Sequence, residues 1–132
     1  MGDPESERAA ARPRARPRVE VCIDCSDALR LAPFWIAALG YQTISGDGQP
    51  YLDLVGPPGS LRVFLQRVPE PKMVKNRLHL DLFSSEPARL VRELLGLGGR
   101  TVGPPFPNQE RWEWQVMQDP EGNEFCVCRE GD

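Results

Sequence analysis

The residues best suited to chemistry are one histidine, four cysteines and carboxylates that recur at alternate positions of the chain. His79 is the single imidazole among 132 residues. A site built from one chain therefore cannot use two imidazoles, which excludes an iron site of two histidines and a carboxylate, an HExxH zinc protease and a three-histidine zinc site. A Ser-His-Asp triad would need His79, and no Gly-x-Ser-x-Gly turn accompanies it.

The spacing of the four cysteines matches a CxxC…CxC zinc site, but the geometry expected for the first pair does not. Cys22 and Cys25 lie an odd number of positions apart within an apparent strand, so their side chains point to opposite faces, whereas a zinc knuckle needs a turn. We predict instead that Cys25 and Cys128 are small core or wall residues. Four clustered cysteines are also too few for a small secreted fold held by disulfides.

The charge is distributed unevenly. Residues 1–18 hold five arginines against three acidic residues, whereas the other 114 residues hold 11 basic and 16 acidic ones. We predict that 1–18 is a disordered basic tail, with a basic arm that tethers a partner as the alternative. Residues 19–132 carry a net negative charge, which disfavours binding to nucleic acid. No apolar run has the length of a membrane span and no signal peptide is recognisable, so we expect a cytoplasmic protein.

The sequence of residues 19–68 predicts elements in the order β-α-β-β-β. Glu20, Cys22 and Asp24 alternate with apolar residues, which is typical of a strand. A helix over 29–39 should end at Gly40, and Pro33 predicts either a kink or a helix that begins near it. Turn sequences separate three further strands, at 41–45, 51–55 and 61–68.

The second half repeats this order. A strand over 77–83 leads to a helix that starts near Pro87, and three strands follow, at 100–102, 111–118 and 124–128. A shift of 59 residues places Glu20 on His79. We therefore predict an α+β fold of two βαβββ modules, 19–68 and 76–129, that curl a mixed sheet around a cleft. The loop over 103–108 is either a lid or an ordinary surface loop.

Polar residues share one face of each strand, opposite an apolar face. The polar sets are Glu20, Cys22 and Asp24; Arg62, Phe64 and Gln66; His79 and Asp81; and Glu124, Cys126 and Cys128. Because unpaired buried carboxylates are costly, this pattern predicts a ligand cleft, with solvated or ion-paired faces as the alternative.

This arrangement resembles the vicinal oxygen chelate superfamily, and within it the glyoxalase-like domains. The resemblance is carried by Ser26-Asp27 after the first strand, Phe34-Trp35 before Leu39-Gly40, the segment 75–81, and Asp-Pro-Glu-Gly-Asn at 119–123. It implies two modules around a cleft, a divalent metal held by two side chains from each module, and a substrate with adjacent oxygens. It also implies a homodimer.

Carried onto this chain, the resemblance implies metal ligands at Glu20 and His79 in the first strands, and at Gln66 and Cys126 in the late strands. The register at Gln66 is open by about two residues. Glyoxalase-type members use mostly His and Glu, often with Gln, so this mixture argues against an ordinary glyoxalase. Its thiol favours zinc or a similar ion. Extradiol dioxygenase chemistry is excluded, because it needs two histidines.

The resemblance therefore predicts a small-molecule enzyme of lyase or isomerase type. Glu20 would be a ligand or general base and His79 a ligand or proton shuttle. The predicted substrate contacts are Phe64, Asp81, Trp112 and Trp114. The alternative is a non-catalytic protein that sequesters an aromatic or antibiotic-like molecule in a wide pocket, against Trp112 or Trp114, Phe64 and Phe106.

Overall fold

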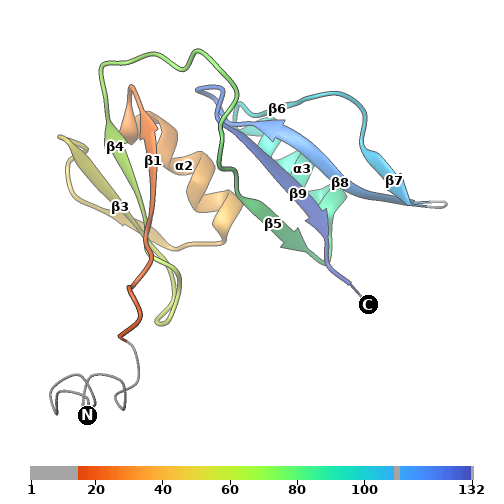
Figure 1. The fold of residues 1–132 in the computed structure, drawn as a ribbon, viewed down its shortest axis with the longest axis horizontal. Coiled ribbons are helices and arrows are strands. Elements are labelled where there is room, and N and C mark those ends of the chain that lie inside the picture. Colours follow the sequence, from red (N-terminus) through yellow and green to blue (C-terminus); the bar gives the residue numbers. More distant parts are fainter. Residues whose placement is uncertain (1–14, 109–110, 132) are drawn as a thin grey trace, which may run out of the picture.

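The computed structural model describes residues 15–108 and 111–131, which fold into two modules lying side by side (Figure 1). Most of the predicted basic tail, residues 1–14, lies outside the described residues. The prediction of an α+β fold with two modules is confirmed, and the strands are divided between two mixed sheets. Neither helix of the described part is long and apolar enough to cross a membrane.

The first module contains four strands and one helix in the predicted order. They are β1 (Val21–Cys25), α2 (Ala28–Leu39), β2 (Thr43–Ser45), β3 (Tyr51–Val55) and β4 (Val63–Arg67). The sheet order is β1-β4-β3-β2, with β1 parallel to β4 and the other pairs antiparallel. Helix α2 packs on one face of this sheet and leaves the other face, which we call its open face, exposed.

Helix α2 confirms the predicted helix ends and excludes one of the two predictions made for Pro33. Asp27 Oδ1 accepts a hydrogen bond from the Arg30 N–H at 3.1 Å, and Gly40 closes the helix with φ 67°. The prediction of a start near Pro33 is wrong, because the helix begins at Ala28. Pro33 lies on the exposed side, where water can solvate the carbonyl that loses its partner.

The second module repeats the plan with one strand more than predicted. It contains β5 (Asp81–Ser84), α3 (Pro87–Gly96), β6 (Arg100–Thr101), β7 (Phe106–Asn108), β8 (Arg111–Gln118) and β9 (Glu124–Arg129). The order is β5-β9-β8-β6, with β5 parallel to β9 and β7 paired to β8. The loop prediction for 103–108 is therefore wrong in part, since 106–108 is a strand. The predicted strand over 77–83 begins only at Asp81.

The two modules share one hydrophobic core. Phe34 and Trp35 of α2 are 1% and 2% exposed, as predicted for core residues. Their rings meet Phe125 of β9 edge-on, with centroids 5.7 and 5.1 Å away. Helix α2 also packs against α3. Because these contacts join residues from both halves of the chain, burial of the aromatic rings stabilises the pair of modules together.

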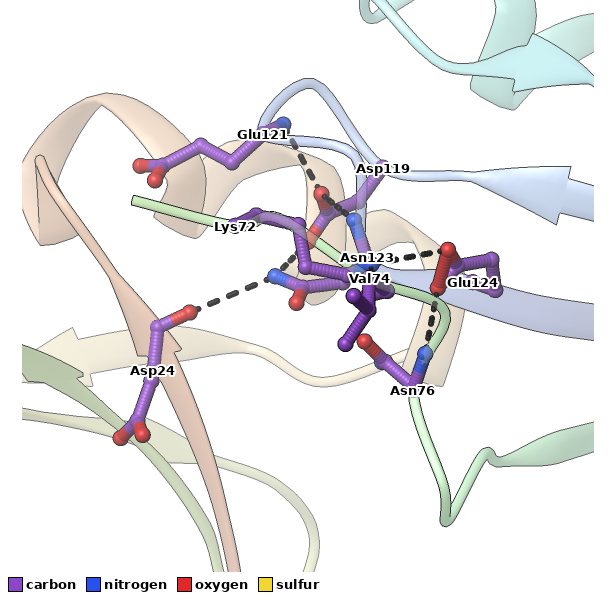
Figure 2. Close-up of polar contacts among 8 residues, drawn as sticks. All are labelled: Asp24, Lys72, Val74, Asn76, Asp119, Glu121, Asn123 and Glu124. Carbon is purple, nitrogen blue, oxygen red and sulfur yellow. Dashed lines mark hydrogen bonds and ion pairs between the residues drawn. The ribbon is translucent and has the colours of Figure 1, made fainter. Parts of the chain in front are cut away.

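The 119–123 turn, between β8 and β9, is a polar joint between the modules (Figure 2). Asp119 is fully buried, and its Oδ2 accepts a hydrogen bond from Trp35 Nε1 at 3.0 Å. Glu121 accepts hydrogen bonds from the backbone N–H groups of Ser26 and Asp27, at 2.6 and 3.0 Å. These bonds satisfy N–H groups at the start of α2 that have no partner within the helix.

Residues 68–80 form the connector between the two modules. This connector is bound to Glu124, the first residue of β9, next to the 119–123 turn. Glu124 accepts a hydrogen bond from the Asn76 backbone N–H at 3.0 Å and pairs with Lys72 Nζ at 2.9 Å (Figure 2). Burial by itself would raise the pKa of the Glu124 carboxyl, but these two donors hold it below its usual value. The connector therefore reaches β5 along a fixed path that brings His79 next to the second sheet.

Candidate functional site

Three side chains with metal-ligand chemistry meet on the open face of the second sheet, the face away from α3. His79 immediately precedes β5, Asp81 is the first residue of β5, and Cys126 is its partner on β9. Their ligand atoms lie within 4.8 Å of one another, with His79 Nε2 3.2 Å from Asp81 Oδ1. This set of nitrogen, oxygen and sulfur donors fits zinc or a similar ion better than magnesium or calcium.

The thiols of this face are protonated at neutral pH. Burial raises the pKa of the Cys126 thiol, and the charge of Asp81 and a hydrogen bond to Asp81 raise it further, against the opposing charge of Lys75. Burial, with the nearby Asp81 charge, raises the pKa of Cys128 to about 11. Cys126 is therefore a thiol until a cation displaces its proton.

The triad forms one end of an open cavity of about 370 Å³. The cavity is lined by His79, Asp81, Phe83, Glu113, Trp114, Cys126, Cys128 and Arg129. The cavity thus brings together four residues predicted from the sequence as metal or substrate contacts: His79, Asp81, Trp114 and Cys126. The cavity has both a polar end and an aromatic wall, which suits a small organic molecule with polar groups at one end.

The two tryptophans of β8 lie in different environments, although simple alternation predicts one shared face. Trp114 is 40% exposed, lines the cavity and stacks on Phe106 of β7, with ring centroids 4.8 Å apart and an interplanar angle of 12°. The β7–β8 register shifts between Phe106 and Pro107, so Glu113 becomes an extra residue in β8. Trp112 packs against the hydrophobic core.

Glu20 is held by cations on the open face of the first sheet. Its carboxylate is hydrogen-bonded to Arg62, whose other terminal nitrogen lies 2.7 Å from Asp53, and it pairs with Arg18 at 3.0 Å. The Arg62 guanidinium also lies over the ring of Phe64, 4.7 Å from its centroid. Glu20 and Phe64, the predicted ligand and substrate contact of this module, therefore face an arginine.

Gln66 is not brought next to Glu20. It is paired in register with Asp24, four residues after Glu20, which places it roughly 13 Å further along the sheet. Its side-chain oxygen accepts a hydrogen bond from the Cys22 thiol at 3.5 Å. Two side chains separated in this way cannot bind the same ion, so the four ligands implied by the resemblance are not gathered within this chain.

The strand registers identify which residues correspond between the modules. Cys22 faces Phe64 in the first module, and Asp81, which is Cys22 shifted by 59 residues, faces Cys126 in the second. The counterpart of Cys126 is therefore Phe64, and Gln66 corresponds to Cys128. The open register of β4 is the reason why the sequence indicated Gln66.

Two cavity residues, Glu113 and Arg129, were not found from the sequence. Arg129 follows Phe125 and Val127 on the apolar side of β9. A charged residue at the end of this apolar series was the one sequence signal that could have singled it out. Glu113 lies at the register shift, so the direction of its side chain depends on a β-bulge that the sequence does not indicate. Its Oε1 accepts a hydrogen bond from Arg111 Nε at 3.1 Å.

Several solved structures share this fold at low sequence identity. The fosfomycin resistance protein FosX from Listeria monocytogenes has a TM-score of 0.70 at 10% identity, covering 89% of this chain and 94% of that one. Hypothetical protein SA1046 from S. aureus has a TM-score of 0.65 at 18% identity, covering 89% and 96%. A glyoxalase/bleomycin resistance protein/dioxygenase family enzyme from Burkholderia phytofirmans PsJN has a TM-score of 0.63 at 19% identity, covering 83% and 95%.

No curated protein matches the chain in sequence. The model of the glyoxalase-like domain family, in contrast, matches residues 20–128, which include both modules and the triad. Together with the two-module fold, this match agrees with the resemblance carried by the first strands and the 119–123 turn. The chain therefore belongs to the glyoxalase-like domain family, within the superfamily that the sequence resembles.

Proposed function

We propose that this chain is a small-molecule enzyme of lyase or isomerase type that uses a divalent metal ion, zinc or a similar ion. The observation that carries the proposal is the approach of His79, Asp81 and Cys126 donor atoms to within 4.8 Å of one another. They lie at the end of a cavity large enough for a small substrate. Membership of the glyoxalase-like family supports this combination of cavity and metal ligands.

When bound, the ion would polarise adjacent oxygens of a substrate and so make a neighbouring C–H bond more acidic. His79, Asp81 and Cys126 would hold it, and His79 Nε2 already lies 3.2 Å from Asp81 Oδ1. Trp114 supplies an apolar wall against which the substrate can be positioned. Glu113 is the cavity carboxylate outside the triad among the described residues, and we assign it as the acceptor of the released proton.

Titration of the metal-free full chain with zinc, followed by calorimetry, tests the proposal. We expect one zinc per chain, with affinity at least tenfold lower in His79→Ala and in Cys126→Ser, because each loses a ligand. Cys22→Ser is the matched control, since Cys22 is also an open-face thiol, but of the first sheet. Unchanged affinity in both triad variants would exclude the metal site.

The role of Glu20 as ligand or base is tested by the same titration. Within one chain Glu20 belongs to the Arg62 ion pair, so Glu20→Ala should bind zinc as the unmodified chain does. A tenfold or greater loss would place Glu20 at the ion, which would require the first sheet of a second copy. That result would replace the single-module site by one shared between two chains.

We also propose a cytoplasmic homodimer. All four cysteines are free thiols, which fits a reducing compartment. The open face of the first sheet exposes Tyr51 and Val55, at 51% and 37%, and a second copy would cover such apolar groups. Sedimentation equilibrium of the full chain tests the assembly, and a monomer at micromolar concentration would rule it out.

The exposed aromatic pair favours a second candidate function, in which the protein binds an aromatic molecule without transforming it. Phe106 and Trp114 are 46% and 40% exposed, and their stacked rings offer a flat apolar surface beside the cavity. This alternative predicts the same ligand affinity with and without zinc, and in His79→Ala. The enzyme proposal predicts that ligand affinity falls when zinc is removed.

A further inference from the structure

The cavity on the open face of the second sheet contains a second thiol, Cys128, which the proposed zinc site does not use. Cys128 follows Cys126 by two residues on β9, so both side chains point to the open face. The pairing of β5 with β9 puts Asp81 beside Cys126 and Phe83 beside Cys128. Both cysteines line the cavity, and both are free thiols. This face therefore carries a Cys-x-Cys pair next to one imidazole.

The spacing of the two cysteines suits one metal ion between their sulfurs. Alternate residues of a strand are about 6.7 Å apart, and two metal–sulfur bonds in line span about 4.6 Å. The two side chains can close this difference by leaning toward each other. Cys128 Sγ is not among the three donor atoms that lie within 4.8 Å of one another, so it has to turn toward the ion. In the part of the chain that the structure describes, no hydrogen bond holds the Cys128 thiol in its present position.

This thiol pair has no equivalent in the first module. The residues at the matching positions of β4 are Phe64 and Gln66, and the Cys22 thiol donates to Gln66 rather than lying beside a second thiol. The fourth cysteine, Cys25, is 4% exposed, and its thiol donates to the Gln66 carbonyl oxygen at 3.6 Å. Within one chain, an ion that needs two thiolates on one sheet face is therefore confined to the second sheet.

The surroundings of the pair favour a soft ion with few ligands. Cys126 is 9% exposed, and Trp114 lies opposite Cys128 on β8, so the sulfur atoms are partly shielded from water. Thiolates select monovalent copper, and imidazole also suits copper, whereas zinc readily accepts a carboxylate and a water as well. Two thiolates and the imidazole of His79 thus fit Cu(I) without any contribution from Asp81.

We infer that Cys126, Cys128 and His79 form a site for monovalent copper, held mainly by the two thiolates. The inference goes beyond the proposed function, because it assigns Cys128 and requires neither Asp81 nor a reaction. The copper and zinc sites share His79 and Cys126, so the cavity holds one of the two ions at a time. Bound copper therefore excludes zinc, and this last consequence alone rests on the proposed function.

Titration of the full chain with Cu(I), under argon and in competition with the cuprous chelator bicinchoninate, tests the site. We expect one tightly bound Cu(I) per chain. Loss of an outer partner of a metal ligand costs 10- to 100-fold in affinity, so loss of a thiolate ligand in Cys128→Ser should cost at least about 100-fold. Asp81→Asn should leave Cu(I) affinity unchanged.

Zinc titration of the same variants gives the matched comparison, with the reverse order expected. Asp81→Asn should weaken zinc at least roughly tenfold, whereas Cys128→Ser should bind zinc as the unmodified chain does, which also shows that this variant folds. Cys22→Ser is the control for an exposed thiol outside the pair, and it should bind both ions normally. Cu(I) affinity that is unchanged in Cys128→Ser, or that falls equally in Cys22→Ser, overturns the assignment of Cys128.

X-ray absorption at the copper edge identifies the ligands without any substitution. Copper in the unmodified chain should have two sulfur neighbours and one nitrogen neighbour, and a single sulfur would overturn the site. The two proposals fail separately. If zinc does not bind but Cu(I) binds through two sulfurs, the copper site stands and the metal enzyme falls. If zinc binds as proposed but Cu(I) does not bind, the zinc site stands and the copper site falls.

Discussion

The open faces of the two modules carry different chemistry on matching positions. Where the second module has His79, Asp81 and Cys126, the strand registers place Glu20, Cys22 and Phe64 in the first. Phe64 cannot ligate a metal. The neighbouring Arg62 lies over the Phe64 ring and pairs with Glu20 and Asp53, so a guanidinium supplies the positive charge on this face.

This difference shows how a duplicated scaffold can keep its geometry and divide its tasks. On the first open face, the carboxylates of Glu20 and Asp53 are paired with arginines. The second has three donor side chains close together, His79, Asp81 and Cys126. The ligand chemistry of this molecule is therefore expected in the second module, with the first acting as its support.

Replacing Asp119 by Ala should have the largest effect, because it breaks the joint through which the first module supports the second. The buried carboxylate accepts hydrogen bonds from Trp35 Nε1, Asn123 Nδ2 and two backbone N–H groups. Its loss would leave the indole N–H buried without an acceptor. We expect a loss of about 3 kcal/mol in the free energy of unfolding, measured by urea denaturation.

Asp47→Ala is the control for this substitution, since Asp47 accepts one backbone hydrogen bond from Gln49 in an exposed turn. It should cost well under half as much. If Asp119→Ala were as mild as Asp47→Ala, the aromatic contacts alone would join the modules, and the polar joint would be unimportant for stability.

The fold could be predicted from the sequence because periodicity, turn residues and helix ends all repeat in the two halves. Alternation over 77–83 and in β9 also placed His79 and Cys126 on one open face. The errors arose where the chain departs from regular alternation. A shift in the β7–β8 register turned Trp112 towards the core, and the pairing of β4 put Gln66 opposite Asp24. Register depends on contacts between distant segments, and a single strand does not encode it.

Thiol reactivity should sharpen the comparison between the faces. The side chain of Cys22, on the first open face, is accessible to solvent overall. Partial desolvation of its thiol, with the nearby Asp24 charge, raises the pKa of that thiol from 9.0 to about 11. A raised pKa means less thiolate at any pH below it. We therefore expect iodoacetamide to modify Cys22 at pH 8 roughly 100-fold more slowly than an ordinary thiol, with a tenfold gain per pH unit.

Peptide mapping by mass spectrometry, with glutathione as the reference thiol, gives the rates. Zinc should protect Cys126, a proposed ligand, and leave the rate at Cys22 unchanged. Modification of Cys22 at the rate of glutathione would show that its thiol is not held protonated by its surroundings. Equal protection of Cys22 and Cys126 by zinc would show that the ion binds across both faces.

Arg62→Met should have the smallest effect, and it tests the independence of the two faces most directly. Arg62 makes exposed ion pairs, which contribute little to stability in water, so the urea midpoint should fall only slightly. The substitution removes the Arg62 partner of Glu20, leaving the exposed pair with Arg18, and keeps an apolar side chain next to Phe64. If Glu20 has no part in metal binding, zinc affinity should stay within threefold of the unmodified chain, roughly 0.6 kcal/mol, and match Arg89→Met. A tenfold change in either direction would mean that the first face reaches the ion, and the division of tasks between the modules would not hold.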